Sequence, residues 1–292
     1  MKIFKSNVLS QHGNFYGVRV VSSLLFFITF LASLNCSASL LITPSRVVFE
    51  DRTRTEQVTL NNKGSETTTY RISFIRQNMT VDGNFEAVED NQEGHYSDEI
   101  VRYSPRQVVL EPGQTQIVRL MLRKPKGLAD GEYRSHMLLQ ALPKVTSTDI
   151  SKAVDENSDE ISVEITTILG VSIPVIVRHG DLESELKLAN ASFVASPESK
   201  KKPYIAVDMN RSGNESTYGD FKVTHVSESG KSTIVGNAKG IAVYSPNQIR
   251  KFQIPVNVIE GVNLKKGRFH ITYVQSGKDE STGLISAIDL EL

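Results

Sequence analysis

The chain has 292 residues, which is enough for two domains, and its 39% hydrophobic and 23% charged content is typical of a folded globular protein. Its 33 basic and 33 acidic side chains cancel, and no long basic run occurs, so the composition argues against a nucleic-acid-binding protein. A single cysteine excludes a disulfide within the chain.

The N-terminal segment has the pattern of a secretory signal peptide. Basic residues precede an uncharged apolar run at 20–34, and small residues follow it. The run is shorter than the ~20 residues of a membrane span, so we expect a cleaved signal over 1–38 rather than an anchor, with no membrane insertion afterwards. Cys36 follows Asn35 instead of a small residue, so lipidation is not expected, and cleavage after Ala38 leaves no cysteine.

Residues 39–180 consist of short β-prone runs separated by turn signals. Asp82-Gly83 and Pro112-Gly113 mark two of the turns. The runs are 40–50, 56–62, 69–78, 100–113, 114–124, 130–143 and 161–178. About seven strands at this spacing are typical of an immunoglobulin-like sandwich, and we predict one here.

A polar segment at 144–160 precedes the last of these runs. It is acidic at its end, contains no aromatic residue, and cannot bury enough apolar surface to order itself. We therefore predict a mobile loop that proteases cut preferentially.

The run 161–178 is long for a strand, because strands average about 5–6 residues. Its apolar side chains fall on alternate positions, which predicts one buried face. These positions are Ile161, Val163, Ile165, Leu169, Val171, Ile173, Val175 and Val177, with Thr167 interrupting the row. The alternation alone leaves open what covers so long an apolar face.

A polar break at 178–185 separates this half from a second set of alternating runs. These are 185–195, 202–210, 220–227, 232–245, 250–259, 267–275 and 283–292. No run has the period of an amphipathic helix. The sequence therefore predicts an all-β protein with two immunoglobulin-like β-sandwich domains, 39–180 and 181–292, joined at an angle.

The motifs give no support for an enzyme or for a cofactor. The mature histidines do not share a metal-ligand spacing; they are His95, His136, His179, His225 and His270. The segment 229–233 lacks the first glycine of a phosphate loop, and 154–160 lacks the central glycine of a calcium loop.

An ordered set of segments resembles the PapD-like periplasmic chaperones of the chaperone–usher pilus pathway. The segments are "SRVVFE" (45–50), "VTLNNKG" (58–64), "LEPGQTQIVRL" (110–120), "DGEYRSHMLLQALP" (130–143), "IPVIVRHG" (173–180) and, more weakly, "KKGRFHITYV" (265–274). The resemblance implies a non-enzymatic periplasmic protein. Its partners would be pilus or fimbrial subunits and an outer-membrane usher.

The resemblance also implies a role for the long strand. In this family the last strand of the first domain completes a subunit that lacks its own final strand. The matching donor positions are Val163, Ile165 and Leu169. The alternative is that the apolar face packs inside its own domain, which we expect for the C-terminal half of the run.

Three arginines match or supplement the family's binding residues. Arg46 matches an arginine that holds the subunit's C-terminal carboxylate, whereas the partner lysine falls at Pro174. Arg134, on the neighbouring strand, is the candidate replacement cation. Arg178 matches a residue that fixes the interdomain angle, and we expect it to face the cleft with Arg46. Pro174 cannot donate to a ladder, so we expect it at an edge or a bend.

Two other classes of protein fit part of this pattern. One is an exported two-domain immunoglobulin-like adhesin or structural surface protein, which neighbouring usher and subunit genes would argue against. The other is an exported hydrolase on a β-sandwich, which would need a cleft with paired carboxylates, and the sequence offers no clear pair.

Overall fold

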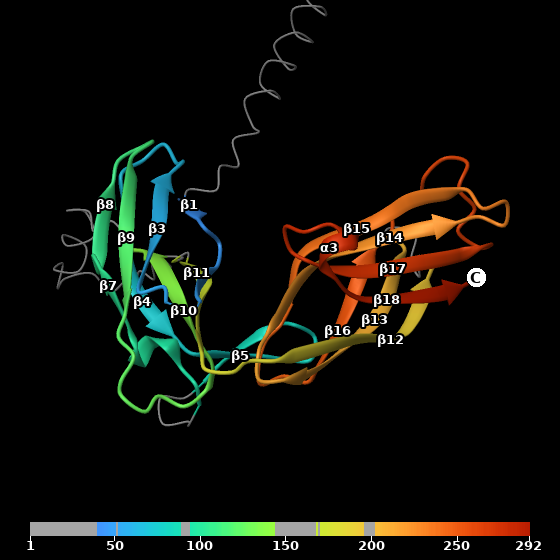
Figure 1. The fold of residues 1–292 in the computed structure, drawn as a ribbon. Helices are drawn as coiled ribbons and strands as arrows, with labels where there is room; N and C mark the ends of the chain where they lie inside the picture. The colour runs from blue at the N-terminus through green and yellow to red at the C-terminus, as the bar shows by residue number, and fades with distance from the viewer. Residues whose placement is uncertain (1–39, 51, 89–93, 144–167, 169, 196–201) are drawn as a thin grey trace, which may run out of the picture.

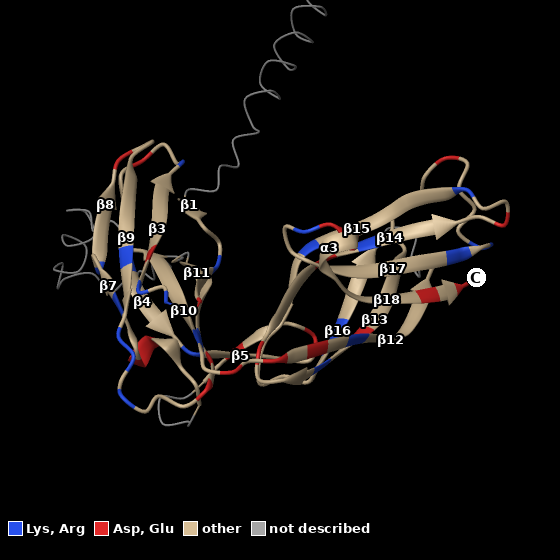
Figure 2. Cartoon of the chain, in the orientation of Figure 1, with Lys and Arg blue, Asp and Glu red and all other residues tan. Residues whose placement is uncertain are grey.

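A computed structural model describes residues 40–50, 52–88, 94–143, 168, 170–195 and 202–292. These residues form two β-sandwiches set at an angle to each other (Figure 1). The predicted signal peptide and the 144–160 segment lie outside the described residues. Acidic and basic residues are interspersed along both sandwiches (Figure 2). The described part of the chain contains no helix long and apolar enough to span a membrane.

The first sandwich packs a four-stranded sheet against a five-stranded sheet. In order, the four strands are β1 (Leu40–Thr43), β3 (Thr55–Asn62), β9 (Thr115–Leu122) and β7 (Val101–Ser104). The five strands are β2 (Val47–Phe49), β11 (Gly170–His179), β10 (Gly131–Ala141), β4 (Thr68–Ile75) and β8 (Gln107–Leu110). A 3-10 helix, η1 (Ser97–Glu99), precedes β7. The predicted run 100–113 is thus two strands that belong to different sheets.

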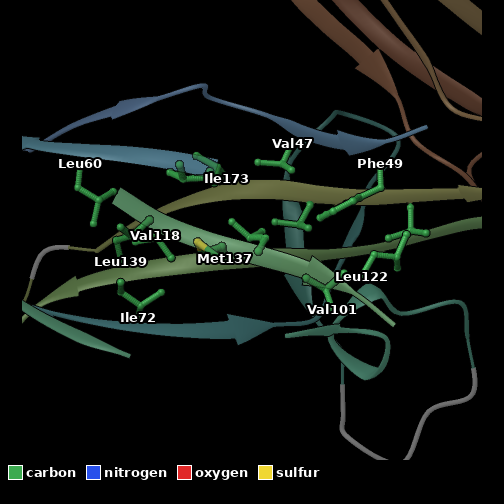
Figure 3. Close-up of a cluster of buried hydrophobic side chains, with 14 of the residues drawn as sticks. Val47, Phe49, Leu60, Ile72, Val101, Val118, Leu122, Met137, Leu139 and Ile173 are labelled. Carbon is green, nitrogen blue, oxygen red and sulfur yellow. The ribbon is translucent and has the colours of Figure 1, made fainter. Parts of the chain in front are cut away.

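Alternating apolar residues of the two sheets form the first core (Figure 3). Strand β9 shows the principle, because Val118, Leu120 and Leu122 are buried and the residues between them are exposed. Strand β10 departs from it, since every residue from Gly131 to Met137 is buried. Burial on both faces requires cover on the outer side of this sheet as well as a core on the inner side.

The second sandwich holds a three-stranded sheet and a four-stranded sheet. The three strands are β12 (Ser184–Val194), β13 (Tyr204–Gly213) and β16 (Ile249–Pro255). The four strands are β15 (Ser232–Val243), β14 (Thr217–Val226), β17 (Arg268–Gln275) and β18 (Leu284–Glu291). One helical turn, α3 (Glu280–Gly283), leads into β18. The prediction of an all-β fold with two sandwiches is confirmed.

A hairpin of the first domain reaches across to the second. It consists of β5 (Gln77–Met79) and β6 (Phe85–Ala87), and Figure 1 shows β5 lying between the sandwiches. The Asn247 amide donates to the Met79 carbonyl at 2.6 Å, and the Lys251 backbone N–H donates to the Val81 carbonyl at 2.8 Å. Gly83 has φ +82° at the tip, where an added Cβ would meet a side chain of the second domain. The predicted turn at this position is therefore present, and it docks on β16.

Candidate functional site at the domain junction

A cross-strand row on the outer face of the five-stranded sheet forms the floor of the junction. Val48 of β2 lies opposite Ile176 of β11, which in turn lies opposite Arg134 of β10. Residues paired in this way point to the same face of a sheet. The neighbours of Ile176 in its strand, Val175 and Val177, belong to the first core. The row Val48, Ile176 and Arg134 therefore points away from that core.

The second domain and the hairpin cover this row. Ile176 is 0% exposed and packs with Met79 of the hairpin and with Ala242 and Tyr244 of the second domain. Burying such an isoleucine against another domain stabilises the arrangement by roughly 1.5–3 kcal/mol. The outer face of β10 and β11 is thus an interdomain core, which explains the two-sided burial of β10.

Arg46 lies at the edge of this interdomain core. Its guanidinium carbon is 4.3 Å from the ring centre of Tyr218 and 5.6 Å from that of Tyr244. Its Nη1 is buried without a hydrogen-bond partner among the described residues. Arg46 also lines a hollow of about 560 Å³, together with Arg178 and residues of the second domain. A cation that lines such a hollow is suited to receive an anion.

Arg134 is more deeply buried than Arg46 and lines a different hollow, of about 630 Å³. It is 7% exposed, and its guanidinium carbon lies 4.6 Å from the ring centre of Tyr244. Burial, and to a smaller extent the charge of Arg46, lowers the pKa of Arg134. His136 is also buried on this face, where burial and the charge of Arg134 lower its pKa to about 3. The two arginines therefore share an aromatic neighbour but open into separate hollows.

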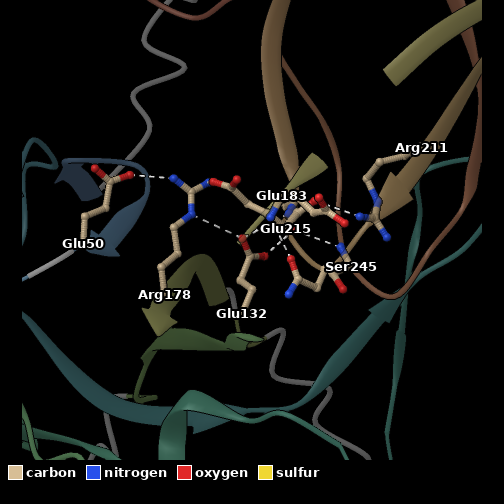
Figure 4. A network of polar contacts seen from close by, with 9 residues as sticks. Glu50, Glu132, Arg178, Glu183, Arg211, Glu215 and Ser245 are labelled. Carbon is tan, nitrogen blue, oxygen red and sulfur yellow. Dashed lines mark hydrogen bonds and ion pairs between the residues drawn. The ribbon is translucent and has the colours of Figure 1, made fainter. Parts of the chain in front are cut away.

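Arg178 joins carboxylates from both domains (Figure 4). Its Nη1 lies 2.6 Å from the Glu50 carboxylate, its Nη2 lies 2.9 Å from Glu215, and its Nε lies 3.5 Å from Glu132. Glu132 also accepts the backbone N–H of Ser216 at 3.1 Å and the hydroxyl of that serine. Because Glu132 belongs to the first domain and Ser216 to the second, this network fixes one domain against the other.

Strand β11 has two partners along only part of its length. β2 pairs with Val175, Ile176 and Val177, whereas β10 pairs with the strand from Gly170 to His179. From Gly170 to Pro174 no described strand lies on the side away from β10. The exposed residues of this segment of β11 include Val171, which is 46% exposed. This part of β11, Gly170–Pro174, is called the open half below.

The directions of the backbone amides in the open half follow from the pairing. The Arg134 N–H donates to the His95 carbonyl rather than to β11, so Arg134 and Ile176 form a non-hydrogen-bonded pair. The amide of Ile176 therefore points away from β10, and so does that of Ser172, since directions alternate along a strand. Position 174 has the same orientation as 172 and 176. An N–H at this position would point to the open side, so the proline costs no hydrogen bond to β10, which agrees with the expected edge position.

Several predicted site residues cannot be placed. Val163, Ile165 and Leu169 lie outside the described residues, as does Thr167. Arg46, Arg134 and Arg178 are brought to one junction, although Arg134 does not line the Arg46 hollow.

Sequence reasoning missed Glu132, Ser216, Tyr244 and the docked hairpin. The one available signal was the spacing of Glu132, Arg134 and His136 on alternate positions of a strand-like run. That pattern predicts a solvent-facing side unless another domain covers it.

Comparison with known proteins gives matches among solved structures. No protein-family model and no curated protein matches the chain. The YadV chaperone is 13% identical, with 87% of this chain and 100% of that chain covered and a TM-score of 0.43. The Pseudomonas aeruginosa CupB2 chaperone is 13% identical, with 86% and 100% covered and a TM-score of 0.40. A chain of the CsuC–CsuE chaperone–tip subunit complex from Acinetobacter baumannii is 15% identical, with 74% and 90% covered and a TM-score of 0.40. The chain is similar to these proteins.

Proposed function

We propose that the chain is a periplasmic chaperone that binds pilus or fimbrial subunits and delivers them to an outer-membrane usher. Residues 1–38 would be removed on export, leaving a subunit-binding domain at 39–180 and a second sandwich at 181–292. The ordered sequence segments described above support this proposal. No cofactor or catalytic residue enters it.

The single observation that carries the proposal is the open half of β11. A strand edge exposes a row of N–H and C=O groups that can pair with a strand from another chain. Val175, Ile176 and Val177, which follow the open half, are held on both sides and on both faces. Such a strand offers a firmly anchored template for an incomplete sandwich, which is what strand complementation requires.

Apolar side chains preceding the open half would supply the specificity. We assign Val163, Ile165 and Leu169 to the open core of the subunit; the first two precede the interruption at Thr167 and the third follows it. Each side chain would contribute roughly 1.5–3 kcal/mol when fully buried there. Backbone pairing is insensitive to sequence, so these positions would select subunits with a matching groove.

Arg46 would hold the subunit's terminal carboxylate at the domain junction. Its place in the 560 Å³ hollow supports this role. Arg134 lies beside the same Tyr244 ring but lines a separate hollow, so it would be the second cation, in place of the absent lysine, through its charge rather than by direct contact. Arg178 would keep the two domains at the angle that forms the hollow.

Site-specific photo-crosslinking tests the proposal. One variant carries a photoreactive residue at Val171 in the open half, and its control carries it at Val109 on β8; the two valines are 46% and 56% exposed. Each is expressed in the periplasm with the subunit encoded beside it. We expect a crosslink to the subunit from position 171 and none from position 109.

The outcome also separates a chaperone from an adhesin. Equal crosslinking from both positions, or none from position 171 while the subunit co-purifies, would refute strand lending at the open half. A gene neighbourhood without usher and subunit genes would favour the adhesin.

A further inference from the structure

Pro174 is the last residue of the open half and stands at the boundary with the anchored part of β11. Directly after it, β2 begins to pair with the strand, with Val47 opposite Val175. Before it, no described strand lies beside β11 on the side away from β10. A proline is rare inside a sheet because it lacks the N–H that a ladder needs, so its place at this boundary calls for a physical reason.

The pairing of β10 shows that this proline removes no hydrogen bond within the domain. Pro174 lies opposite His136, and β10 pairs with β4 in continuous register from His136 to Ala141. The next residue, Leu142, donates its backbone N–H to the Thr69 carbonyl of β4 at 2.8 Å. His136 and Leu142 are an even number of positions apart, so the His136 amide also points to β4. His136 and Pro174 therefore form a non-hydrogen-bonded pair.

The proline leaves a gap in the row of backbone donors on the open edge. The amides that point to this side come from alternate residues, which are Gly170, Ser172 and, beside β2, Ile176. At ~3.3 Å per residue, donors on a regular edge recur about every 6.6 Å, whereas those of Ser172 and Ile176 are about 13 Å apart. Ser172 is therefore the last donor that the open half offers to another chain.

A strand that pairs with the open half loses its ladder after the bond to Ser172. Two residues further towards β2, its carbonyl would face the Pro174 ring instead of an amide, and a buried carbonyl without a donor is costly. A shift of two residues is the smallest that keeps the same side chains on the same face. The missing amide thus disfavours the nearest alternative register in one direction, and loss of the Ser172 bond disfavours it in the other.

The apolar side chains that precede the open half define the register poorly by themselves. Ile161, Val163 and Ile165 are β-branched and apolar at every second position, and Thr167 alone interrupts the row before Leu169. A slip of two residues would therefore bring a similar side chain to most of the same pockets in a partner. A backbone feature that occurs at one position only, such as a missing amide, removes this ambiguity.

We propose that Pro174 is a positioning residue that ends the ladder of a bound strand at Ser172 and thereby fixes the register of that strand on β11. The inference rests on the proposed strand lending and adds the residue that sets where pairing stops. The family resemblance places a lysine at this position, and a lysine keeps the amide. The proline therefore changes the backbone edge as well as the side chain, and its fixed φ keeps the boundary rigid.

Mapping the register with a photoreactive residue at position 171 tests the inference. In the otherwise native protein, we expect the crosslink to fall on one main residue of the subunit, identified by mass spectrometry of the digested adduct. Pro174→Ala restores the amide, so a second crosslinked residue should appear two positions away. The share of this second residue should rise about two- to ten-fold over native, which corresponds to one backbone hydrogen bond.

Two further variants show whether the position of the missing amide is what matters. Ser172→Pro places a proline at another residue whose amide points away from β10, so it should fold as the native protein does and move the crosslink by two residues in the opposite direction. Pro112→Ala removes an exposed turn proline before β9 and should leave the crosslinked residue unchanged. Thermal melting checks folding, and Ser172→Pro decides the question if Pro174→Ala does not fold.

Failure of this inference and failure of the proposed function give different results. Absence of any crosslink from position 171 in the native protein would refute strand lending and, with it, the role of Pro174. A crosslink that stays on one residue in native protein, Pro174→Ala and Ser172→Pro would refute the register role alone. Crosslinks spread equally over several residues in the native protein would also overturn it, because the register would then not be fixed.

Discussion

The two halves of β11 carry the same alternation and lie in opposite surroundings. Val175, Ile176 and Val177 are all 0% exposed, because β2 and β10 flank them and the second domain covers their outer face. In the open half, Gly170, Val171 and Ser172 are exposed. One strand thus combines an anchor, fixed by two domains, with an edge that no described strand covers. The difference shows that the same apolar alternation can lie between two strands at one end and at an edge of the described sheet at the other.

The largest expected effect comes from changing the anchored half. Ile176→Ser places a hydroxyl in the interdomain core and removes most of a fully buried side chain, so we expect a loss of about 3–4 kcal/mol in the free energy of unfolding. Val171→Ser, in the open half, should cost less than about 0.5 kcal/mol. Urea unfolding of the two variants measures both values. Equal losses would mean that the two halves are not distinct in the folded protein.

A substitution in the polar network around Arg178 tests whether buried charge fixes the junction. Glu132→Gln leaves Arg178 and Ser216 with a poorer acceptor in a site where the side chain is 1% exposed, and we expect a loss of about 2 kcal/mol. Glu185→Gln is the matched control, because Glu185 pairs with Lys187 on the surface and should matter little. Thermal unfolding of both proteins compares them. A loss of stability no larger for Glu132→Gln than for Glu185→Gln would show that the network does not stabilise the junction.

A smaller effect is expected from pH. The pKa of His136 is about 3 in the folded protein, against about 6.5 when unfolded, so the unfolded chain binds the extra proton between these values. Stability should therefore fall as the pH drops from 6.5 towards 3, by about 1–2 kcal/mol at pH 5 from this group. His136→Leu should unfold with that part of the pH dependence missing. Parallel stability profiles for native protein and variant would show that His136 is not held neutral at the junction.

The sequence predicted local structure well and the junction poorly, for physical reasons. Alternation and turn residues act over a few positions, so they identified β11, the turn at Gly83 and the edge position of Pro174. Arg134 lies against Tyr244, more than a hundred residues away in the chain, and His136 lies against Phe85 of the docked hairpin. No local pattern distinguishes a polar face in water from one covered by another domain.

The hollow that Arg134 lines shows the same limit. Arg134 was identified from the family resemblance, and Arg46 matched an expected anchor. That the two open into different hollows follows only from how the docked hairpin and the second domain pack on the sheet. The donor positions Val163, Ile165 and Leu169 remain predictions, and they rest on the sequence.

Amide hydrogen exchange at Ser172 and Ile176 tests the central claim most directly. Both amides point away from β10, but β2 lies beside Ile176 alone. In the free protein, Ser172 should exchange rapidly and Ile176 slowly; when the subunit is bound, Ser172 should become protected as a strand pairs with it. A Ser172 amide that is protected in the free protein, or that exchanges at the same rate with and without the subunit, would contradict strand lending by β11.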